Sequence, residues 1–324
     1  AQFFGMFAFI AWRGWQPAEE AIAGLASHVA VSEGRGSRKK SRFRLLVPIA
    51  NPQTIRRLVR LASAIAKEKQ GEILLLRVLT VPEQLPPTQF DEAKLEEERA
   101  VLREARKACE EFGVPSHGVV RVGHKVARAI LETSTDWNCD LIILGWKGHS
   151  RSRERILGNI TDAIVKFADT DIMLVKFVGN APINHILLPT AGGEHAQWAE
   201  QYCATIARAV DGSVTVCRVV PEDESRTDSE IHKERLKPAV ERIFEEGGFT
   251  IKSKVIRNDS IADGIIEAAE GYDAIMVGAT RQSIYPQILF GNIPEKIAMG
   301  ANKTVIMVKH HDPVKALLGK VVGE

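Results

Sequence analysis

Three glycines and an asparagine near the middle of the chain have the spacing of a phosphate-binding loop. They are Gly145, Gly148, Gly158 and Asn159, and they follow the apolar run Leu141–Leu144. Glycine lets backbone N–H groups approach an anion without a Cβ atom in the way, and a helix start adds a favourable dipole. The spacing therefore favours phosphate binding. The alternative is a strand–loop–helix corner that needs glycine only for its backbone conformation.

The same pattern occurs a second time in the chain. Residues 274–310 align without a gap with residues 141–177. Further matching pairs are Gly278 with Gly145, Gly291 with Gly158, Asn292 with Asn159, Ile186–Pro189 with Leu45–Pro48, and Gly212–Val220 with Gly71–Leu79. Recurrence of many segments in the same order indicates two copies of one domain.

Alternating apolar segments predict strands and helices in turn. In the first copy the expected strands are Arg44–Ile49, Glu72–Leu79, Val119–Val122, Asp140–Leu144 and Asp171–Phe177, and the expected helices are Gln53–Gln70, Asp91–Phe112, Val126–Thr135 and Asn159–Ala168. This order predicts an α/β fold of two tandem Rossmann-like domains, each with a five-stranded parallel sheet. A ligand would bind beyond the carboxyl ends of the strands, where Pro48–Asn51, Arg77–Thr80 and Leu144–Gly148 converge.

Composition is that of an ordinary globular protein. The 324 residues suggest about two domains, and the net charge of +2 argues against a nucleic-acid partner. The four cysteines are scattered and favour a reducing compartment. Nine histidines, including the pair His310-His311, have no ligand spacing, so no metal site is predicted.

The N-terminal region has two contrasting parts. Phe3–Trp12 is strongly apolar, and Arg35–Arg42 is basic. An apolar segment followed by a basic cluster is typical of the cytoplasmic end of a transmembrane helix, whereas the alternative is an amphipathic arm that packs on the protein. The expected divisions are residues 1–42 as apolar stub and linker, 43–178 and 183–310 as the two domains, and 311–324 as a tail.

With its glycine motif and tandem repeat, the chain resembles the universal stress protein family, whose domains have an adenine nucleotide alpha-hydrolase-like fold. The resemblance covers residues 43–309, and Gly145, Gly148, Gly158 and Asn159 fit the family's ATP-binding motif in full. It implies that these residues and the N–H of Ile160 hold the phosphates and ribose. It also implies an adenine pocket formed by Pro48, Ile49, Ala50, Asn51 and Val78.

Both copies depart from the family pattern. Many members have an acidic residue after the first strand, where the first copy has Ala50-Asn51. In the second copy Arg281 replaces the middle glycine, and it would either pair with a phosphate or fill the nucleotide space. The resemblance implies a second, weaker site at Pro189, Thr190, Gly192, Gly193, Gly278, Arg281, Gly291 and Asn292.

Side chains near the first motif have two interpretations each. Lys147, Arg151, Arg153 and Arg155 either neutralise a triphosphate or form a solvated loop. Trp146 either covers a ligand or lies at a surface or interface. Because no nucleophile elbow, zinc-binding pair or Walker motif occurs, we expect no enzyme, with slow ATP hydrolysis left open.

The resulting hypothesis is a regulatory module that binds ATP or AMP, with or without Mg²⁺. Tandem domains of this family follow permease cores such as amino-acid transporters, so we expect the cytoplasmic tail of a membrane transporter, at the cytoplasmic face of the membrane. The alternatives are a free cytosolic stress protein and an adenylating enzyme. The last strands, Ile172–Val175 and Val305–Val308, either pair within one chain or leave faces for a homodimer.

Overall fold

The computed structural model describes residues 29–33, 42–148, 157–224, 226–246, 249–280 and 289–311. The apolar stub, nearly all of the basic linker, the arginines at 151, 153 and 155, Arg281, and the tail from residue 312 lie outside these residues.

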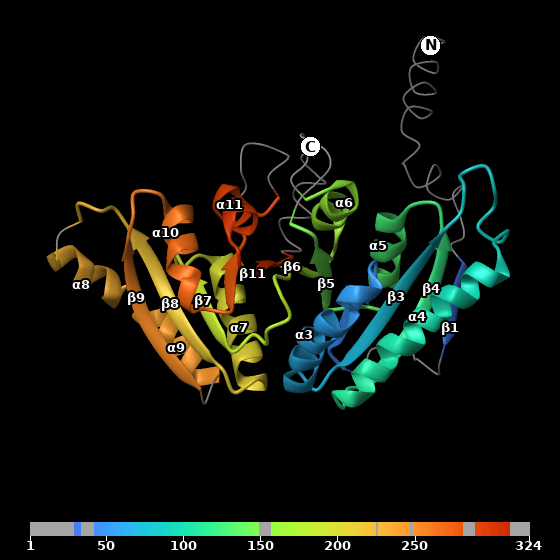
Figure 1. Ribbon diagram of the computed structural model, residues 1–324, viewed down its shortest axis with the longest axis horizontal. Helices are drawn as coiled ribbons and strands as arrows, with labels where there is room; N and C mark the ends of the chain where they lie inside the picture. Colours follow the sequence, from blue (N-terminus) through green and yellow to red (C-terminus); the bar gives the residue numbers. More distant parts are fainter. Residues whose placement is uncertain are drawn as a thin grey trace, which may run out of the picture.

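Two similar domains lie side by side (Figure 1). The first contains β2 (Arg44–Pro48), η1 (Pro52–Thr54), α3 (Ile55–Glu68), β3 (Glu72–Thr80), α4 (Glu92–Glu111), β4 (Ser116–Gly123), α5 (Val126–Asp136), β5 (Leu141–Trp146), α6 (Asn159–Phe167) and β6 (Asp171–Lys176). The second contains β7 (His185–Pro189), α7 (Glu194–Ala209), β8 (Ser213–Val220), α8 (Arg226–Glu234), α9 (Lys237–Glu246), β9 (Thr250–Arg257), α10 (Ile261–Ala268), η2 (Ala269–Gly271), β10 (Ala274–Gly278), α11 (Asn292–Gly300) and β11 (Thr304–Lys309). The α/β fold predicted from the repeat is confirmed.

One sheet runs through both domains. Its order is β1-β4-β3-β2-β5-β6-β11-β10-β7-β8-β9, and the strands inside each domain are parallel neighbours. In the first domain the strand order reverses between β2 and β5. A crevice for a ligand is expected at this switch point.

The domains join through their last strands. β6 and β11 pair antiparallel, with Ile172 opposite Lys309 and Lys176 opposite Val305. Of the two arrangements left open by the sequence, the structure has the one within a single chain.

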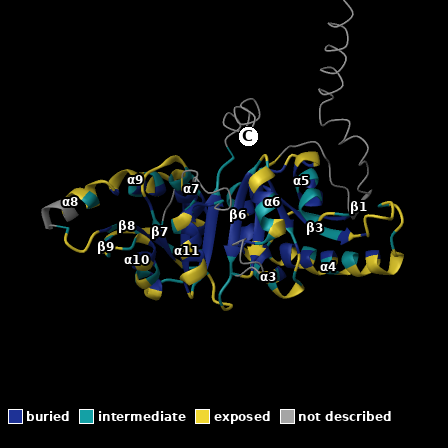
Figure 2. Cartoon of the chain, turned by 90° about the horizontal axis from the view of Figure 1, so that it is seen from above, coloured by how far each residue is buried: buried dark blue, intermediate teal, exposed yellow. Residues whose placement is uncertain are grey.

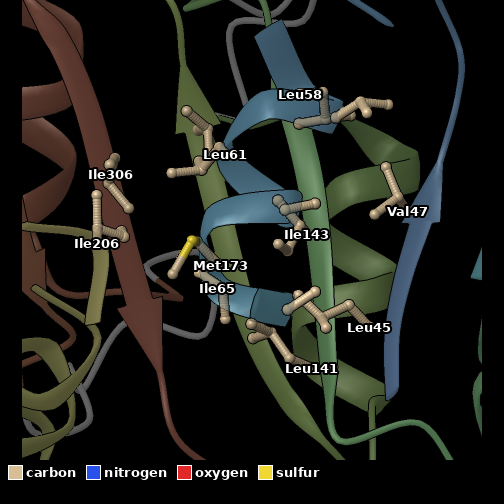
Figure 3. Close-up of a cluster of buried hydrophobic side chains, with 14 of the residues drawn as sticks. Leu45, Val47, Leu58, Leu61, Ile65, Leu141, Ile143, Met173, Ile206 and Ile306 are labelled. Carbon is tan, nitrogen blue, oxygen red and sulfur yellow. The ribbon is translucent and has the colours of Figure 1, made fainter. Parts of the chain in front are cut away.

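Helices cover both faces of the sheet. Consecutive residues of β2 point to opposite faces, so that Leu45 and Val47 pack beneath α3 while Leu46 packs on the α5 and α6 side. Figure 3 shows the first cluster crossing the domain joint, from Ile65 of α3 to Ile206 of α7. Seen from above, the central strands are buried and the outer faces of the helices are exposed (Figure 2). Apolar strands buried on both sides are typical of parallel sheets.

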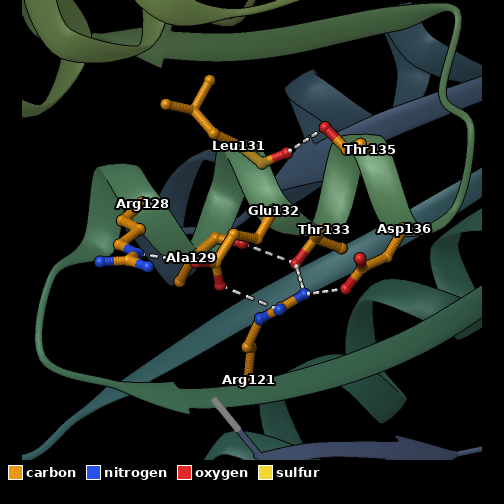
Figure 4. A network of polar contacts seen from close by, with 8 residues as sticks. All are labelled: Arg121, Arg128, Ala129, Leu131, Glu132, Thr133, Thr135 and Asp136. Atoms are coloured by element: carbon orange, nitrogen blue, oxygen red, sulfur yellow. Dashed lines mark hydrogen bonds and ion pairs between the residues drawn. The ribbon is translucent and has the colours of Figure 1, made fainter. Parts of the chain in front are cut away.

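A buried arginine fastens α5 to the sheet. Arg121 of β4 donates to Asp136 at 2.8 Å, Glu132 at 3.0 Å and Thr133 at 3.2 Å (Figure 4). Its side chain is 9% exposed. Because a buried charge requires partners, the helix carboxylates hold this arginine in place.

Two elements differ from the sequence prediction. A strand, β1 (Val29–Glu33), lies before the basic linker, within the predicted stub and linker of residues 1–42, and pairs antiparallel with β4. Strand β4 begins at Ser116, three residues before the predicted start at Val119. In the part of the chain that the structure describes, no helix is both long and apolar enough to cross a membrane.

Candidate functional site

The predicted site residues of the first domain meet where β2 and β5 end. Ile49 continues from β2 and its N–H donates to Leu76 O at 2.9 Å. Arg77 supports this turn, because its Nη1 donates to Ile49 O at 2.5 Å and its Nε pairs with Glu98. The predicted convergence of the strand ends is thus observed, with Arg77 turned toward the backbone of the β2 turn.

The three glycines of the first motif have different roles. Gly148 and Gly158 have φ angles of +83° and +99°, which a residue with a side chain rarely adopts. Gly145 has no such φ, yet a Cβ built on it would meet no atom of the described residues within 4 Å, and the same holds for Gly158. None of the described residues therefore fills the space beside Gly145 or beside Gly158.

The start of α6 is exposed beside this space. Gly158 is the N-cap residue and provides no side-chain hydrogen bond to the first turn, while Asn159 and Ile160 are exposed. The first N–H groups of a helix have no partners within the helix, and they carry the positive end of its dipole. This arrangement is suited to an anion. The glycines, Asn159 and the N–H of Ile160, predicted to act together, lie in one loop-to-helix segment.

Among the residues predicted to form the adenine pocket, one side chain already makes a hydrogen bond within the chain, and the others differ in exposure. Asn51 Oδ1 accepts from Gln53 N at 3.0 Å and caps η1, so this oxygen already serves the chain itself. Ala50 is exposed, and Val78 is half-buried.

Trp146 is buried in the core rather than exposed at the site. It is only 8% exposed and belongs to the core on the α5 and α6 side of the sheet. The interpretations of Trp146 as a ligand cover or a surface residue were therefore wrong, because the side chain alternation of β5 directs it inward.

In the second domain the equivalent space is filled. A Cβ on Gly278 would collide with the backbone carbonyl of His195, in the first turn of α7. A Cβ on Gly291 would collide with the Thr280 side chain. Thr280 N also donates to Phe290 O at 2.7 Å, which closes the base of the loop between them.

A carboxylate of the chain itself occupies the amides of this second loop. Glu295 Oε1 accepts from Leu289 N at 2.8 Å and from Phe290 N at 2.9 Å, and the residue is 2% exposed. Burial raises the pKa of the Glu295 carboxyl, although the two amides oppose this effect. An internal carboxylate thus binds amides of the segment that precedes α11.

The glycine-rich turn after β7 is also satisfied internally. The Thr190 hydroxyl donates to Glu200 Oε1 at 2.7 Å and accepts from Gly192 N at 3.1 Å. Glu200 Oε2 in turn accepts from Arg242 Nη2 at 2.7 Å. Of the predicted second-site residues, Gly278 and Gly291 thus face packed protein and Thr190 is bonded internally, whereas Gly192, Gly193 and Asn292 are exposed. Pro189 is the last residue of β7, and Arg281 lies outside the described residues.

The sequence prediction missed Thr280, Glu295 and the contact with His195. An acidic residue in the first turn of a helix is common, because it favours the helix dipole. Glu295 thus gave no distinct signal. Thr280 directly precedes Arg281, which stands where the first copy has Gly148. This replacement was the one sign in the sequence that the second loop differs.

Comparison with known proteins places these features in one family. The sequence model of the universal stress protein family matches residues 42–176 and 182–309. A Na(+)/H(+) antiporter of Synechocystis is 24% identical over 262 residues, which are 80% of this chain. The chain spans only 37% of the antiporter's length.

Further likenesses agree with this assignment. A universal stress protein of Methanocaldococcus jannaschii is 28% identical over 118 residues, covering 35% of this chain and 69% of that protein. The crystal structure of a universal stress protein from Archaeoglobus fulgidus superposes with a TM-score of 0.60 at 16% identity, covering 83% of this chain and 97% of that one. Because the family match includes both repeats and most of the chain, the protein belongs to the universal stress protein family, with two of its domains in tandem.

Proposed function

We propose that the first domain binds an adenine nucleotide, ATP or AMP. The observation that carries the proposal is the contrast between the two copies. In the part of the chain that the structure describes, no atom fills the space beside Gly145 or Gly158, whereas protein atoms fill the space beside Gly278 and Gly291. A family motif that is complete in sequence and open in structure supports binding in the first copy.

Each part of the proposed site has a physical task. Backbone N–H groups at Gly148, Gly158 and Ile160 receive the phosphates at the positive end of α6. The turn Pro48–Asn51, with Val78 beside it, takes the adenine. Mg²⁺ would accompany ATP through its phosphate oxygens, and no side chain is assigned to it.

The second domain, in this proposal, holds no nucleotide. Glu295 accepts from the backbone amides of Leu289 and Phe290, which could otherwise bind an anion. Thr280 and His195 fill the space beside Gly291 and Gly278. Like charges at one anion site repel, so a phosphate would have to displace this carboxylate.

We further propose that the module regulates a membrane transporter from its cytoplasmic side. Support comes from the likeness to the antiporter and from the sequence of the apolar and basic segments before residue 43. Nucleotide occupancy would act by favouring one of two arrangements of the module. The alternative is a free cytosolic protein of the same family. No catalytic role is assigned.

A substitution at Gly145 tests the nucleotide site. Because Gly145 has an ordinary φ and open space around a Cβ, Gly145→Val should fold while its side chain enters the proposed site. We expect ATP and AMP affinities, measured by calorimetry, to fall by about tenfold or more. Gly271→Val is the matched control, since Gly271 also has an ordinary φ and nothing within 4 Å of a Cβ. Absence of binding by the unsubstituted protein, or equal binding by Gly145→Val, would contradict the proposal.

The link to a transporter has a separate test. Translation of the reading frame upstream of Ala1 should give hydrophobic spans of a transporter core. A start codon directly before Ala1 would favour the free protein. Where the spans are present, ion flux in vesicles should differ between nucleotide-free and nucleotide-loaded protein.

A further inference from the structure

The helices that begin at the two glycine loops end at the domain joint. α6 and α11 lie on the same face of the continuous sheet, on either side of β6 and β11 (Figure 1). The last carbonyls of a helix have no partner within it, and they carry the negative end of its dipole. The groups that satisfy these carbonyls therefore stabilise the helices from the end opposite to the loops.

In each case the group is a lysine of the other domain. Lys309 of β11 donates from Nζ to Val165 O of α6 at 3.1 Å. Lys176 of β6 donates from Nζ to Ala298 O at 2.8 Å and to Ala301 O at 2.6 Å, at the end of α11. The two lysines are the final residues of the paired last strands, so the antiparallel joint carries each of them into the opposite domain.

Lys176 also contacts the first glycine loop. A Cβ built on Gly148 would lie 3.1 Å from Cδ and 3.2 Å from Cε of Lys176. The stem of this lysine thus packs along Gly148 while its ammonium group reaches α11. One side chain therefore connects the loop of the first domain with a helix of the second.

Both ammonium groups have lost part of their hydration. Burial lowers the pKa of Lys176 and of Lys309, and the nearby Glu295 carboxyl partly offsets this for Lys309. Glu295 in turn lies within the electrostatic reach of Asp162 in the first turn of α6. Charges removed from water act more strongly on one another, so Lys309 influences α6 more than an exposed lysine would.

We propose that Lys309 is a positioning residue for α6, the helix whose first turn forms part of the proposed phosphate site, and that the second domain supplies it. This inference rests on the proposed nucleotide site. Lys309 holds the end of α6, and its positive charge offsets the negative end of the helix dipole, which leaves the potential at the first turn of α6 more favourable for phosphates. Lys176 performs the same task for α11 and supports Gly148 from behind. The closed second domain is thereby a structural part of the first site.

Lys309→Met should lower the affinity for ATP by about three- to tenfold, as expected for loss of a charge at a helix C-terminus. Lys309→Arg should restore most of the affinity, because it keeps the charge and the donors. Lys166→Met is the matched control: Lys166 is exposed in the last turn of the same helix. It should change the affinity by less than about twofold. If Lys309→Met does not fold, Lys309→Gln serves instead, because it keeps a donor without the charge.

Hydrogen exchange of the nucleotide-free protein distinguishes this inference from the proposed function. Lys309→Met should speed exchange in residues 159–168 of the first domain, and Lys176→Met should speed it in residues 292–301 of the second. If the protein binds no nucleotide but each substitution speeds exchange in the other domain, the proposed function fails. The conclusion that each lysine stabilises a helix of the other domain then still holds. If each substitution speeds exchange only in its own domain, or Lys309→Met binds ATP as tightly as the control, the inference is overturned.

Discussion

At the scale of single residues, a few side chains decide which loop is open. Among the described residues nothing fills the space beside Gly145 and Gly158, whereas Thr280 lies against Gly291 and Glu295 binds the amides of Leu289 and Phe290 in the second domain. Both loops end in Gly-Asn, so the end of the motif does not distinguish the two cases, and only the replacement of the middle glycine by Arg281 marks the second copy as different.

The pH dependence of stability should report the buried state of Glu295. Burial raises its pKa above the ordinary value of 4.5. The folded protein therefore holds more protons than the unfolded chain as the pH rises above that value, so the contribution of Glu295 to stability is lost through this window. Glu295→Gln still accepts from the two amides but does not titrate. We expect its free energy of unfolding to increase relative to that of wild type as the pH rises from 4.5 toward neutrality, because only wild type loses stability over this range.

Denaturant unfolding at several pH values measures this difference. Glu270→Gln serves as the control, because Glu270 is an exposed glutamate of the same domain. A constant difference between Glu295→Gln and wild type across the range would show that burial of Glu295 does not perturb its titration.

The sequence accounts for the backbone of two motif glycines, but it did not predict the groups that fill the second loop. Positive φ at Gly148 and Gly158 follows from the residue type and the spacing of the motif. The bond between Glu295 and the amides of Leu289 and Phe290 depends on how the loop folds back on α11, and sequence spacing does not express that path.

At the scale of elements, α5 depends on its arginine anchor. We expect Arg121→Met to lower the free energy of unfolding by about 2 kcal/mol, because its charged hydrogen bonds to Glu132 and Asp136 are lost. Arg128→Met removes only a half-exposed bond to Glu132 at 2.7 Å and should cost about 0.5 kcal/mol. Chemical unfolding compares the two, and equal costs would contradict the role of Arg121 as the anchor.

Most elements could be predicted because their apolar patterns are strong. In α3 the buried residues Ile55, Leu58, Leu61 and Ile65 recur at helical spacing. β1 was missed because its five residues, between the apolar stub and the basic linker, are too few to show a clear strand pattern. Its strand conformation comes from pairing with the exposed edge of β4.

At the scale of the whole molecule, the joint between β6 and β11 completes an otherwise open edge. A chain truncated after Val178 would expose the apolar strand β6. Because exposed strand edges pair with one another, we expect this fragment to form a dimer through β6, as measured by light scattering over a dilution series. Circular dichroism checks that the fragment is folded. A folded fragment that stays monomeric at every concentration would contradict the expectation.

The tandem repeat predicted two domains and their sheets, but not how they meet. The same last strands serve equally for pairing within a chain and for pairing between chains. The choice depends on whether residues 177–184 span the distance between the domains, and the structure has them do so.

Joining both halves in one chain also changes how the protein can evolve. A short connection keeps the halves at an effective concentration of the order of millimolar, so their pairing does not depend on how much protein the cell makes. In a pair of identical chains every substitution appears in both halves at once. Here Thr280 and Glu295 close one half while Gly145 leaves the other open. Covalent linkage thus allows the two domains to differ in sequence and in ligand binding, which two copies of an identical chain cannot do.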